Sequence, residues 1–224
     1  MIEIKRTKDL DKPSLVMCVY GQGGVGKTTL ATTAPRPVFL DAEEGTKALG
    51  ARGIDVAVVR VKSWKDVQEA WGLISKSDDY DTVVVDPVGA FISLLIEEIK
   101  GGGDMSIGKW GIAKDKMSKF IWAVKSSGKH VVFIAHESKD KDEDKLLRSP
   151  KLTANLSDDL VNLCDVVGHL RITKDGKREL LTQPRDKYAA KDRFDSLGVT
   201  NVDPNVTEMI ARIHARYSEE PFKS

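Results

Sequence analysis

The sequence predicts an α/β protein whose central sheet is mostly parallel, is flanked by helices and carries an antiparallel hairpin toward its C-terminal side. Two observations lead to this fold class. Short apolar segments alternate along the chain with segments of helical periodicity, a pattern typical of βαβ units. A glycine-rich turn joins the first apolar segment to the first predicted helix, as in open sheets whose parallel strands are connected by helices.

Composition and charge narrow the class of protein. The chain has 224 residues, 41% of them hydrophobic, and 35 basic side chains against 34 acidic ones give a net charge of +1. Such a chain can bury a core of its own. Near-neutral charge excludes a generally polybasic protein, so nucleic acid could bind only at a local patch. Two distant cysteines, no signal peptide and no apolar run of about 18 residues predict a cytoplasmic protein without a membrane span.

Seven apolar segments are expected to form strands. The segment 82–85 is continuously apolar, as expected of a parallel strand covered on both faces. The turn 174–177 (KDGK) predicts a hairpin between the last two strands. The seven predicted strands are 15–20, 37–40, 56–61, 82–85, 130–135, 166–173 and 178–182.

Helical periodicity predicts five helices between and after these strands. Ser63 can cap the second of them, and Trp64, Trp71 and Trp122 are expected in the core. The polar stretch 137–156, which contains KDKDEDK, is expected to be a mobile loop. The predicted helices are 27–34, 63–76, 88–100, 109–127 and 205–217. The expected organisation is an N-terminal arm (1–13), a core domain (14–195) and a C-terminal helix with a tail (196–224).

The strongest motif is the segment 21–28 (GQGGVGKT), which fits G-x-x-x-x-G-K-[ST] between a predicted strand and a predicted helix. Its glycines let successive N–H groups point inward at phosphate oxygens, and the helix that follows presents its positive end. Lys27 can bind the β- and γ-phosphates, and the Thr28 hydroxyl can bind Mg²⁺. The alternative is a chance glycine-rich turn. The predicted nucleotide-binding residues are Gly21, Gln22, Gly23, Gly24, Val25, Gly26, Lys27, Thr28 and Thr29.

A second group is needed to hold the metal. Asp86 ends the apolar strand 82–85, at the edge of the sheet where ligands bind in open α/β folds. We therefore expect its carboxylate to bind Mg²⁺ together with Thr28, directly or through water. The alternative role, as N-cap of the helix 88–100, is compatible with the first.

The segment 39–45 (FLDAEEG) ends the second predicted strand with three carboxylates in four residues. Hydrolysis of a triphosphate needs a base that orients the attacking water. The segment resembles the F-[IL]-D-x-E segment of the RecA-like recombination ATPases, and the resemblance places the catalytic glutamate at Glu43. Glu44 takes that role if the register shifts by one residue. The alternative is that these carboxylates are solvated loop charges.

Three further site residues are implied by the same resemblance. His136 follows the strand 130–135, and in RecA-like folds the polar residue at this strand end faces the γ-phosphate. His130, His169 and His214 are interpreted as incidental. The segment 188–194 (YAAKDRF) resembles a K-x-[KR] pair that contacts the γ-phosphate of a neighbouring subunit, which implies catalytic roles for Lys191 and Arg193. The alternative is a solvated surface pair.

The segments DAEEG, VVVD, IAH and AAKDRF occur in an order that resembles small phage-encoded ATPases with a RecA-like core, of the single-strand annealing recombination family. The resemblance covers roughly residues 14–195. It implies a RecA-like P-loop NTPase fold, ATP and Mg²⁺ as ligands, and an ATPase stimulated by single-stranded DNA. It also implies a homo-oligomer, ring or filament, and a phage or host single-strand-binding protein as a further partner.

The sequence departs from this family in two ways. The arm 1–13 has no F-x-x-A element that would link subunits, and there is no separate DNA-binding domain. DNA contacts are therefore expected from the loops 101–109 and 137–156. The stretch 139–145 has a local charge of −1, which is unfavourable for phosphate. Lys145, Arg148 and Lys151 form a better basic stretch, and Lys100, Lys109 and Trp110 could supply charge and a stacking ring. The equal alternative for Trp110 is a place in the core.

Rival interpretations share the phosphate site. The chromosome-partition ATPases carry a lysine directly before the paired glycines, where this chain has Gln22, which counts against them. A phage helicase loader or packaging ATPase remains open, and so does a nucleotide-gated interaction module with little turnover.

Overall fold

The computed structural model describes residues 4–7, 10–142, 145–152, 156–185 and 187–217. Ten strands in this part of the chain form one connected sheet system, in the order β10-β8-β7-β1-β5-β4-β2-β3, with β6 paired to β5 and β9 paired to β7. The strands are β1 (Val16–Gly21), β2 (Pro37–Asp41), β3 (Ala57–Arg60), β4 (Thr82–Asp86), β5 (His130–Asp142), β6 (Lys145–Pro150), β7 (Val166–Ile172), β8 (Arg178–Leu181), β9 (Lys191–Asp192) and β10 (Thr200–Val202).

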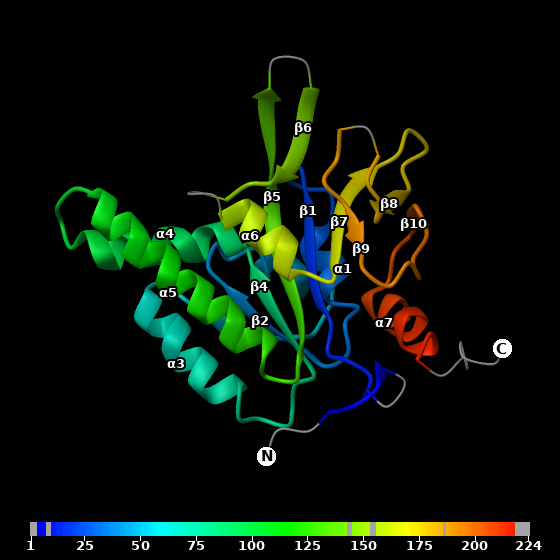
Figure 1. Ribbon diagram of the computed structural model, residues 1–224, viewed down its shortest axis with the longest axis horizontal. Coiled ribbons are helices and arrows are strands. Elements are labelled where there is room, and N and C mark those ends of the chain that lie inside the picture. The colour runs from blue at the N-terminus through cyan, green and yellow to red at the C-terminus, as the bar shows by residue number, and fades with distance from the viewer. Residues whose placement is uncertain (1–3, 8–9, 143–144, 153–155, 186, 218–224) are drawn as a thin grey trace.

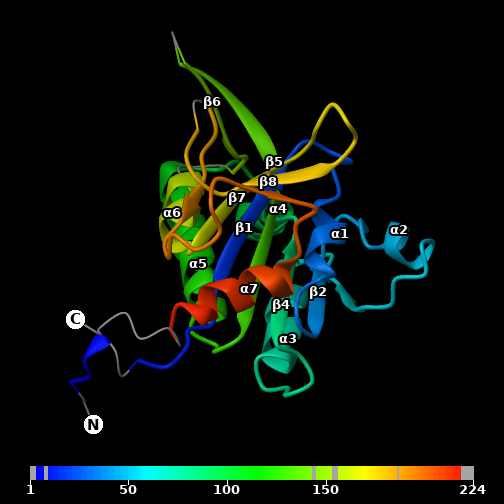
Figure 2. The same ribbon diagram turned by 90° about the vertical axis from the view of Figure 1, so that its right-hand side faces the viewer.

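Helices cover both faces of this sheet (Figures 1 and 2). Helices α3 to α6 pack on one face, whereas α1 and α7 pack on the other. The helices are α1 (Lys27–Ala31), α2 (Lys47–Gly50), α3 (Trp64–Ile74), α4 (Val88–Lys100), α5 (Ile107–Lys125), α6 (Leu156–Leu163) and α7 (Val206–Ala215). No helix in the described ranges is both long enough and apolar enough to cross a membrane.

The central strands run parallel and the C-terminal ones do not. Strands β7, β1, β5, β4, β2 and β3 pair in parallel along the sheet. Strand β8 pairs antiparallel with β7 across the turn that Gly176 completes at φ +82°, and β10 continues antiparallel beside β8. The predicted fold class, a mostly parallel sheet with an added antiparallel hairpin, is confirmed.

Strand β1 shows how the core is divided between the two faces. All six of its residues are buried, because successive side chains of a strand point to opposite faces and both faces are covered. Val16, Cys18 and Tyr20 join one hydrophobic cluster, and Met17 and Val19 join the other. Continuous burial explains why the segment shows no apolar–polar alternation.

Two of the three tryptophans predicted in the core are there. Trp64 is 4% exposed and follows Ser63, which caps α3 in a capping box, and Trp71 packs half-buried against the same cluster. Trp122 was predicted wrongly, since it is 56% exposed. Helix α5 buries the stripe Ala113, Met117, Phe120, Ile121 and Val124, and at helical spacing Trp122 lies outside this stripe.

The stretch 137–156, predicted as a mobile loop, is instead a β-hairpin over most of its length. Strand β5 continues to Asp142 and pairs antiparallel with β6, from Glu137 opposite Pro150 to Asp142 opposite Lys145. The hairpin projects beyond the edge of the sheet (Figure 1). Its backbone hydrogen bonds need no apolar side chains, so a run of charges did not reveal it. Residues 143–144 and 153–155 of that stretch lie outside the described ranges.

Candidate nucleotide-binding site

The turn between β1 and α1 has a conformation that requires glycine. Gly24 and Gly26 have φ of +80° and +98°, which residues with a side chain rarely adopt. A Cβ atom on Gly21 would lie 2.3 Å from the carbonyl oxygen of Leu170 on β7. The loop therefore fits against β7 only with the glycines that the motif provides, and it lines a pocket with the residues at the start of α1.

Lys27 places a positive charge at the floor of this pocket. Its residue exposure is only 7%, and its Nζ donates hydrogen bonds to the carbonyl oxygens of Gly21, at 2.9 Å, and Gln22, at 2.8 Å. Burial lowers the pKa of Lys27, while the carboxylates of Asp86, Glu137 and Glu43 oppose that shift. A partly desolvated ammonium gains from an anionic partner, so the position suits a phosphate group.

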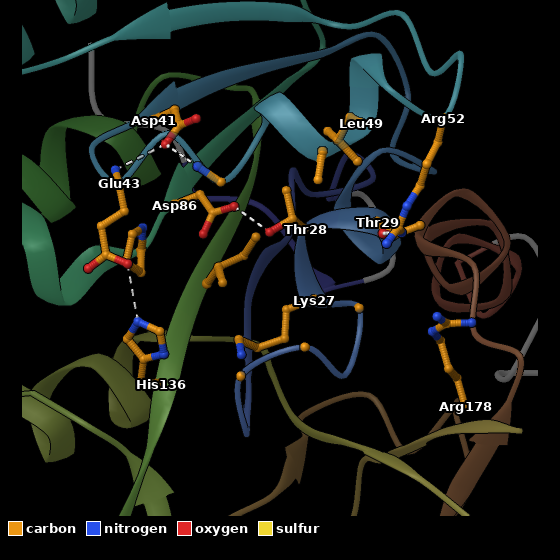
Figure 3. A pocket seen from close by; sticks show the side chains of 17 residues that line it. Lys27, Thr28, Thr29, Asp41, Glu43, Leu49, Arg52, Asp86, His136 and Arg178 are labelled. Atoms are coloured by element: carbon orange, nitrogen blue, oxygen red, sulfur yellow. Dashed lines mark hydrogen bonds and ion pairs between the residues drawn. The ribbon is translucent and has the colours of Figure 1, made fainter. Parts of the chain in front are cut away.

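Asp86 and Thr28 meet in the same pocket. The Thr28 hydroxyl donates to Asp86 Oδ2 at 2.7 Å, and both residues line the pocket (Figure 3). Burial raises the pKa of Asp86 to about 6. The Thr28 hydrogen bond and Lys27 lower it, and the charges of Asp41 and Glu43 raise it. A buried carboxylate beside a hydroxyl is a hard-oxygen donor set that fits Mg²⁺.

Thr28 and Asp86 together offer a metal ion one hydroxyl and one carboxylate. Among the described residues, no group of three or more His, Cys, Asp or Glu side chains could hold a metal by itself. Mg²⁺ in such sites keeps waters and binds substrate phosphates beside one or two carboxylates. The pair of Thr28 and Asp86 is therefore sufficient only when a phosphate ligand completes the coordination.

Glu43 and His136 face each other across the pocket (Figure 3). His136 Nε2 lies 3.4 Å from Glu43 Oε2, and the two side chains are 48% and 52% exposed. His136 stands opposite Gly21 in the register of β5 and β1, which brings it beside the start of the glycine loop. Strand β5 lies between β1 and β4 in the sheet.

The geometry separates Glu43 from Glu44, the two candidate bases. Glu43 lines the pocket. Glu44 has φ +58° and turns toward two cations, Lys47 and Arg60, with which it forms ion pairs. The hydrogen bond from Lys47 and the positive charges of Lys47 and Arg60 lower the pKa of Glu44. Glu43 is therefore the better placed of the two to contact a bound phosphate, and its catalytic role remains a prediction.

Asp41 holds the turn that presents Glu43, a role that the sequence analysis did not assign. Its carboxylate is 1% exposed and accepts hydrogen bonds from the backbone N–H groups of Glu43, Gly45 and Thr46 and from the Thr46 hydroxyl. The signal was present in FLDAEEG, where an Asp at a strand end can satisfy the following N–H groups. A single sequence does not distinguish such an Asp from a metal ligand.

Arg52 and Arg178 also line the pocket, and the sequence analysis missed both. Arg52 follows α2, a short helix that was not predicted, and Arg178 begins β8. Both come from segments remote in sequence from the glycine loop, so no local motif could identify them. Figure 3 shows them at the end of the pocket away from Glu43 and His136.

Lys191 and Arg193 do not line this pocket. Lys191 Nζ donates to the carbonyl oxygens of Val161 and Asn162, and Arg193 pairs with Asp165 at 2.8 Å. Strand β9 pairs with the first residues of β7, at the opposite strand end from the glycine loop. Contact with a γ-phosphate thus requires a second subunit, and that role remains a prediction.

A buried ion cluster lies directly behind the pocket. The Glu137 side chain is 3% exposed and contacts Arg148 Nη1 at 2.6 Å and His169 Nε2 at 2.9 Å. The Tyr20 hydroxyl donates to the carbonyl oxygens of Arg148 and Ala189. The cluster joins β1, β5, β6 and β7 next to Gly21 and His136, so it fixes the strand ends that carry the site.

The candidates for contacting DNA are partly engaged within the protein. Arg148 is turned inward onto Glu137, with 24% of its side chain exposed. Lys109 Nζ donates to the carbonyl oxygens of Lys100 and Asp104. Trp110 is half-buried, whereas Lys151 is exposed. The side chain of Lys145 lies outside the described part of the structure.

Comparison with known proteins agrees with this geometry. A family model described as an AAA domain matches residues 14–194. A curated relative, the SPbeta prophage-derived uncharacterized protein YorG of Bacillus subtilis (strain 168), is 29% identical over 140 residues. That match covers 56% of this chain and 42% of the relative, so it spans less than half of the relative's length. Because the family match covers most of the chain and includes the glycine loop, the chain belongs to this family of P-loop AAA-domain ATPases.

Proposed function

We propose that this protein binds and hydrolyses ATP with Mg²⁺ and, as a homo-oligomer, uses this cycle to bind and anneal single-stranded DNA in phage recombination. The observation that carries the ATPase is the meeting of five side chains in one pocket. A buried ammonium (Lys27), a metal-binding pair (Thr28 and Asp86) and a carboxylate with its imidazole neighbour (Glu43 and His136) line the same space. This is the set of groups that phosphoryl transfer to water requires.

Each group has a distinct role in the proposed reaction. The N–H groups of the glycine loop and Lys27 bind the phosphates and fix their direction. Glu43 accepts the proton of the attacking water. His136, beside Glu43, donates a hydrogen bond toward the γ-phosphate. Thr28 and Asp86 would hold Mg²⁺, which neutralises charge on the phosphates when bound.

The DNA part of the proposal rests on less direct support. The segments DAEEG, VVVD, IAH and AAKDRF resemble the annealing ATPases of phages, and one relative is named as prophage-derived. The β5–β6 hairpin extends directly from His136 and projects from the sheet. A segment in that position is suited to contact a partner in a manner that depends on the occupied pocket. Single-stranded DNA and a single-strand-binding protein are the partners that the resemblance implies.

ATP turnover measured with and without single-stranded DNA tests the proposal. We expect Glu43→Gln to reduce kcat by about 100-fold or more, because the water loses its base, while ATP binding persists. Glu44→Gln is the matched control, since Glu44 pairs with Lys47 and Arg60 outside the pocket, and it should retain kcat within about twofold.

Three outcomes separate the rival functions. Turnover that rises with single-stranded DNA, and DNA affinity that falls steeply with salt, support the full proposal. Turnover that responds to a protein partner or to duplex DNA instead supports a helicase loader or a packaging ATPase. Tight ATP binding without turnover in the wild type supports a nucleotide-gated interaction module.

A further inference from the structure

The pocket has two chemically different ends. Glu43 and His136 lie at one end, and Thr29, Arg52 and Arg178 lie at the other, with Lys27 between them (Figure 3). The hydrolytic groups must contact the γ-phosphate, and the motif lysine binds the β- and γ-phosphates. The α-phosphate, ribose and base therefore have to extend toward the end that carries the two arginines.

Arg178 lies against the glycine loop itself. Its Nε donates to the carbonyl oxygen of Val25 at 3.2 Å. A Cβ atom on Gly26 would come within 2.6 Å of that Nε. The glycine at position 26 thus leaves room for the guanidinium as well as permitting φ +98°. This contact brings the Arg178 guanidinium to the rim of the phosphate site.

Arg52 approaches the same end of the pocket from α2. Its Nη1 donates to the Thr29 hydroxyl at 3.4 Å. Leu49, one helical turn before it and 2% exposed, supplies an apolar lining residue beside it. In Figure 3 the Arg52 and Arg178 side chains reach toward each other from opposite sides of the pocket end.

Among the residues that the structure describes, neither Arg52 nor Arg178 forms an ion pair with an acidic side chain. Within the described residues, other arginines such as Arg36, Arg60 and Arg171 form ion pairs with carboxylates. Arg52 and Arg178 form none, and each is exposed. Two guanidinium planes without carboxylate partners at the mouth of a pocket are available to a ligand. Guanidinium planes stack on aromatic rings and attract π-electron faces.

We propose that Arg52 and Arg178 form a clamp for the base of a purine nucleoside triphosphate, one guanidinium on each side of the ring. The inference rests on the proposed nucleotide binding at the glycine loop and adds to it the recognition of the base. Stacking strength grows with ring area and does not depend on the groups at the base edge. The clamp therefore prefers purines to pyrimidines and discriminates little between adenine and guanine.

Calorimetric titration of the full chain with Mg²⁺ and ATP, GTP or CTP tests the clamp. The three ligands share the triphosphate, so the ratio of Kd for CTP to Kd for ATP isolates the contribution of the base. We expect this ratio to be about five to ten in the wild type, with GTP close to ATP. Arg52→Ala and Arg178→Ala should each weaken ATP binding by about three- to tenfold and bring the ratio toward one.

Two further variants serve as controls, one for the loss of an arginine outside the pocket and one for the loss of the hydrogen bond to Val25. Arg60→Ala removes an arginine that pairs with Glu44 and does not line this pocket, so its ratio should equal that of the wild type. Arg178→Gln can still donate to the Val25 carbonyl but lacks the guanidinium plane, so it should reduce the ratio as Arg178→Ala does.

The outcomes distinguish the clamp from the nucleotide site. An unchanged ratio in all the clamp variants, or an equal loss of ATP and CTP affinity, overturns the clamp and leaves the nucleotide site in place. A wild type that binds none of the three nucleotides overturns the proposed function and the clamp together. A ratio that falls only in the Arg52 and Arg178 variants supports both.

Discussion

Two pairs of histidine and glutamate meet at consecutive residues in the middle of β5, His136 and Glu137, and have opposite environments. His136 and Glu43 are about half exposed and 3.4 Å apart, whereas His169 and Glu137 are 4% and 3% exposed and 2.9 Å apart. His136 and Glu137 are consecutive on β5, so they point to opposite faces of the strand. One face presents groups to the pocket and the other secures the strand that carries them.

The two pairs differ in how many hydrogen bonds and ion pairs each glutamate carboxylate forms. Glu137 is fixed by a guanidinium and an imidazole, so it has little capacity left for a ligand. Glu43 lines the pocket, and within the described part of the chain its one side-chain hydrogen bond is the loose contact to His136 at 3.4 Å. We infer that changes in the exposed pair alter rate and that changes in the buried pair alter stability.

The largest expected effect is on the buried pair. Glu137→Ala should lower the free energy of unfolding by about 3 kcal/mol, because the partly buried Arg148 guanidinium would lose its carboxylate and the buried His169 imidazole would lose its hydrogen-bond partner. Glu43→Ala, at a half-exposed position, should change it by about 0.5 kcal/mol or less. Chemical denaturation of both variants measures this contrast. Equal losses for the two would show that the comparison is wrong.

Asp86 extends the comparison to a buried carboxylate whose hydrogen-bond partner, among the described residues, is the Thr28 hydroxyl. Burial raises its pKa to about 6 in the folded protein, from an ordinary value of 3.8. Between these values the folded state binds more protons than the unfolded state, so stability falls as pH rises toward 6 and stays low above it. In nucleotide-free protein at pH 8, Asp86→Asn should therefore increase the free energy of unfolding, by at most about 3 kcal/mol.

Thermal denaturation of Asp86→Asn and wild type at pH 8 and pH 5 measures this effect. The stabilisation should shrink at pH 5, where the wild-type carboxyl is mostly protonated. The same variant should lose the stabilisation by Mg²⁺ and ATP that we expect for the wild type. If the variant is less stable than wild type at pH 8, the ionised Asp86 carboxylate does not destabilise the nucleotide-free protein and this prediction is wrong.

The exposed histidine should affect rate and not stability. His136→Ala should reduce kcat by about tenfold, because a hydrogen-bond donor near the γ-phosphate is lost. Its free energy of unfolding should stay within about 0.5 kcal/mol of wild type. Single-turnover hydrolysis and a denaturation curve on the same preparation separate the two readouts. A large loss of stability with unchanged kcat would show that His136 stabilises the fold and does not act in hydrolysis.

The smallest expected effect concerns the buried histidine. Burial lowers the pKa of His169, although its hydrogen bond to Glu137 opposes the shift. Its contribution to stability is therefore present above the unfolded pKa of about 6.5 and is lost as pH falls below that value. His169→Gln should flatten this part of the stability profile between pH 7 and 5. If the slope of the unfolding free energy against pH is unchanged, a group other than His169 causes the loss of stability at acid pH.

Contiguous sequence motifs predict the residues at the phosphate-binding end of the pocket. They do not identify the residues at the other end. The motif 21–28 and the strand end at Asp86 are contiguous signals, and they predict neighbours because parallel strands end at one edge. Arg52 and Arg178 come from a short helix and a strand start with no pattern of their own. Their approach to Gly26 and Thr29 depends on tertiary packing, which a single sequence does not reveal.

The elements of the fold also divide into those that local sequence predicts and those that it does not. Buried strands such as β1 and β4 were predicted from apolar runs, because burial on both faces dictates composition. The β5–β6 hairpin was missed because its strands lie outside the layered core and are held by backbone pairing. The prediction for Trp122 was wrong for a different reason. An aromatic residue type favours the core, but helical spacing puts other residues of α5 on the buried face, namely Met117, Phe120, Ile121 and Val124.

Gly26 carries two requirements at once, a left-handed backbone and a space that the Arg178 guanidinium fills. Any larger residue there would disturb phosphate binding and displace the arginine in one step. Altering which nucleobase the protein accepts is therefore easier through Arg52, whose side chain makes a long hydrogen bond to the Thr29 hydroxyl, than through Arg178, whose position is tied to the loop. Attempts to redesign the ligand preference should begin on the α2 side of the pocket.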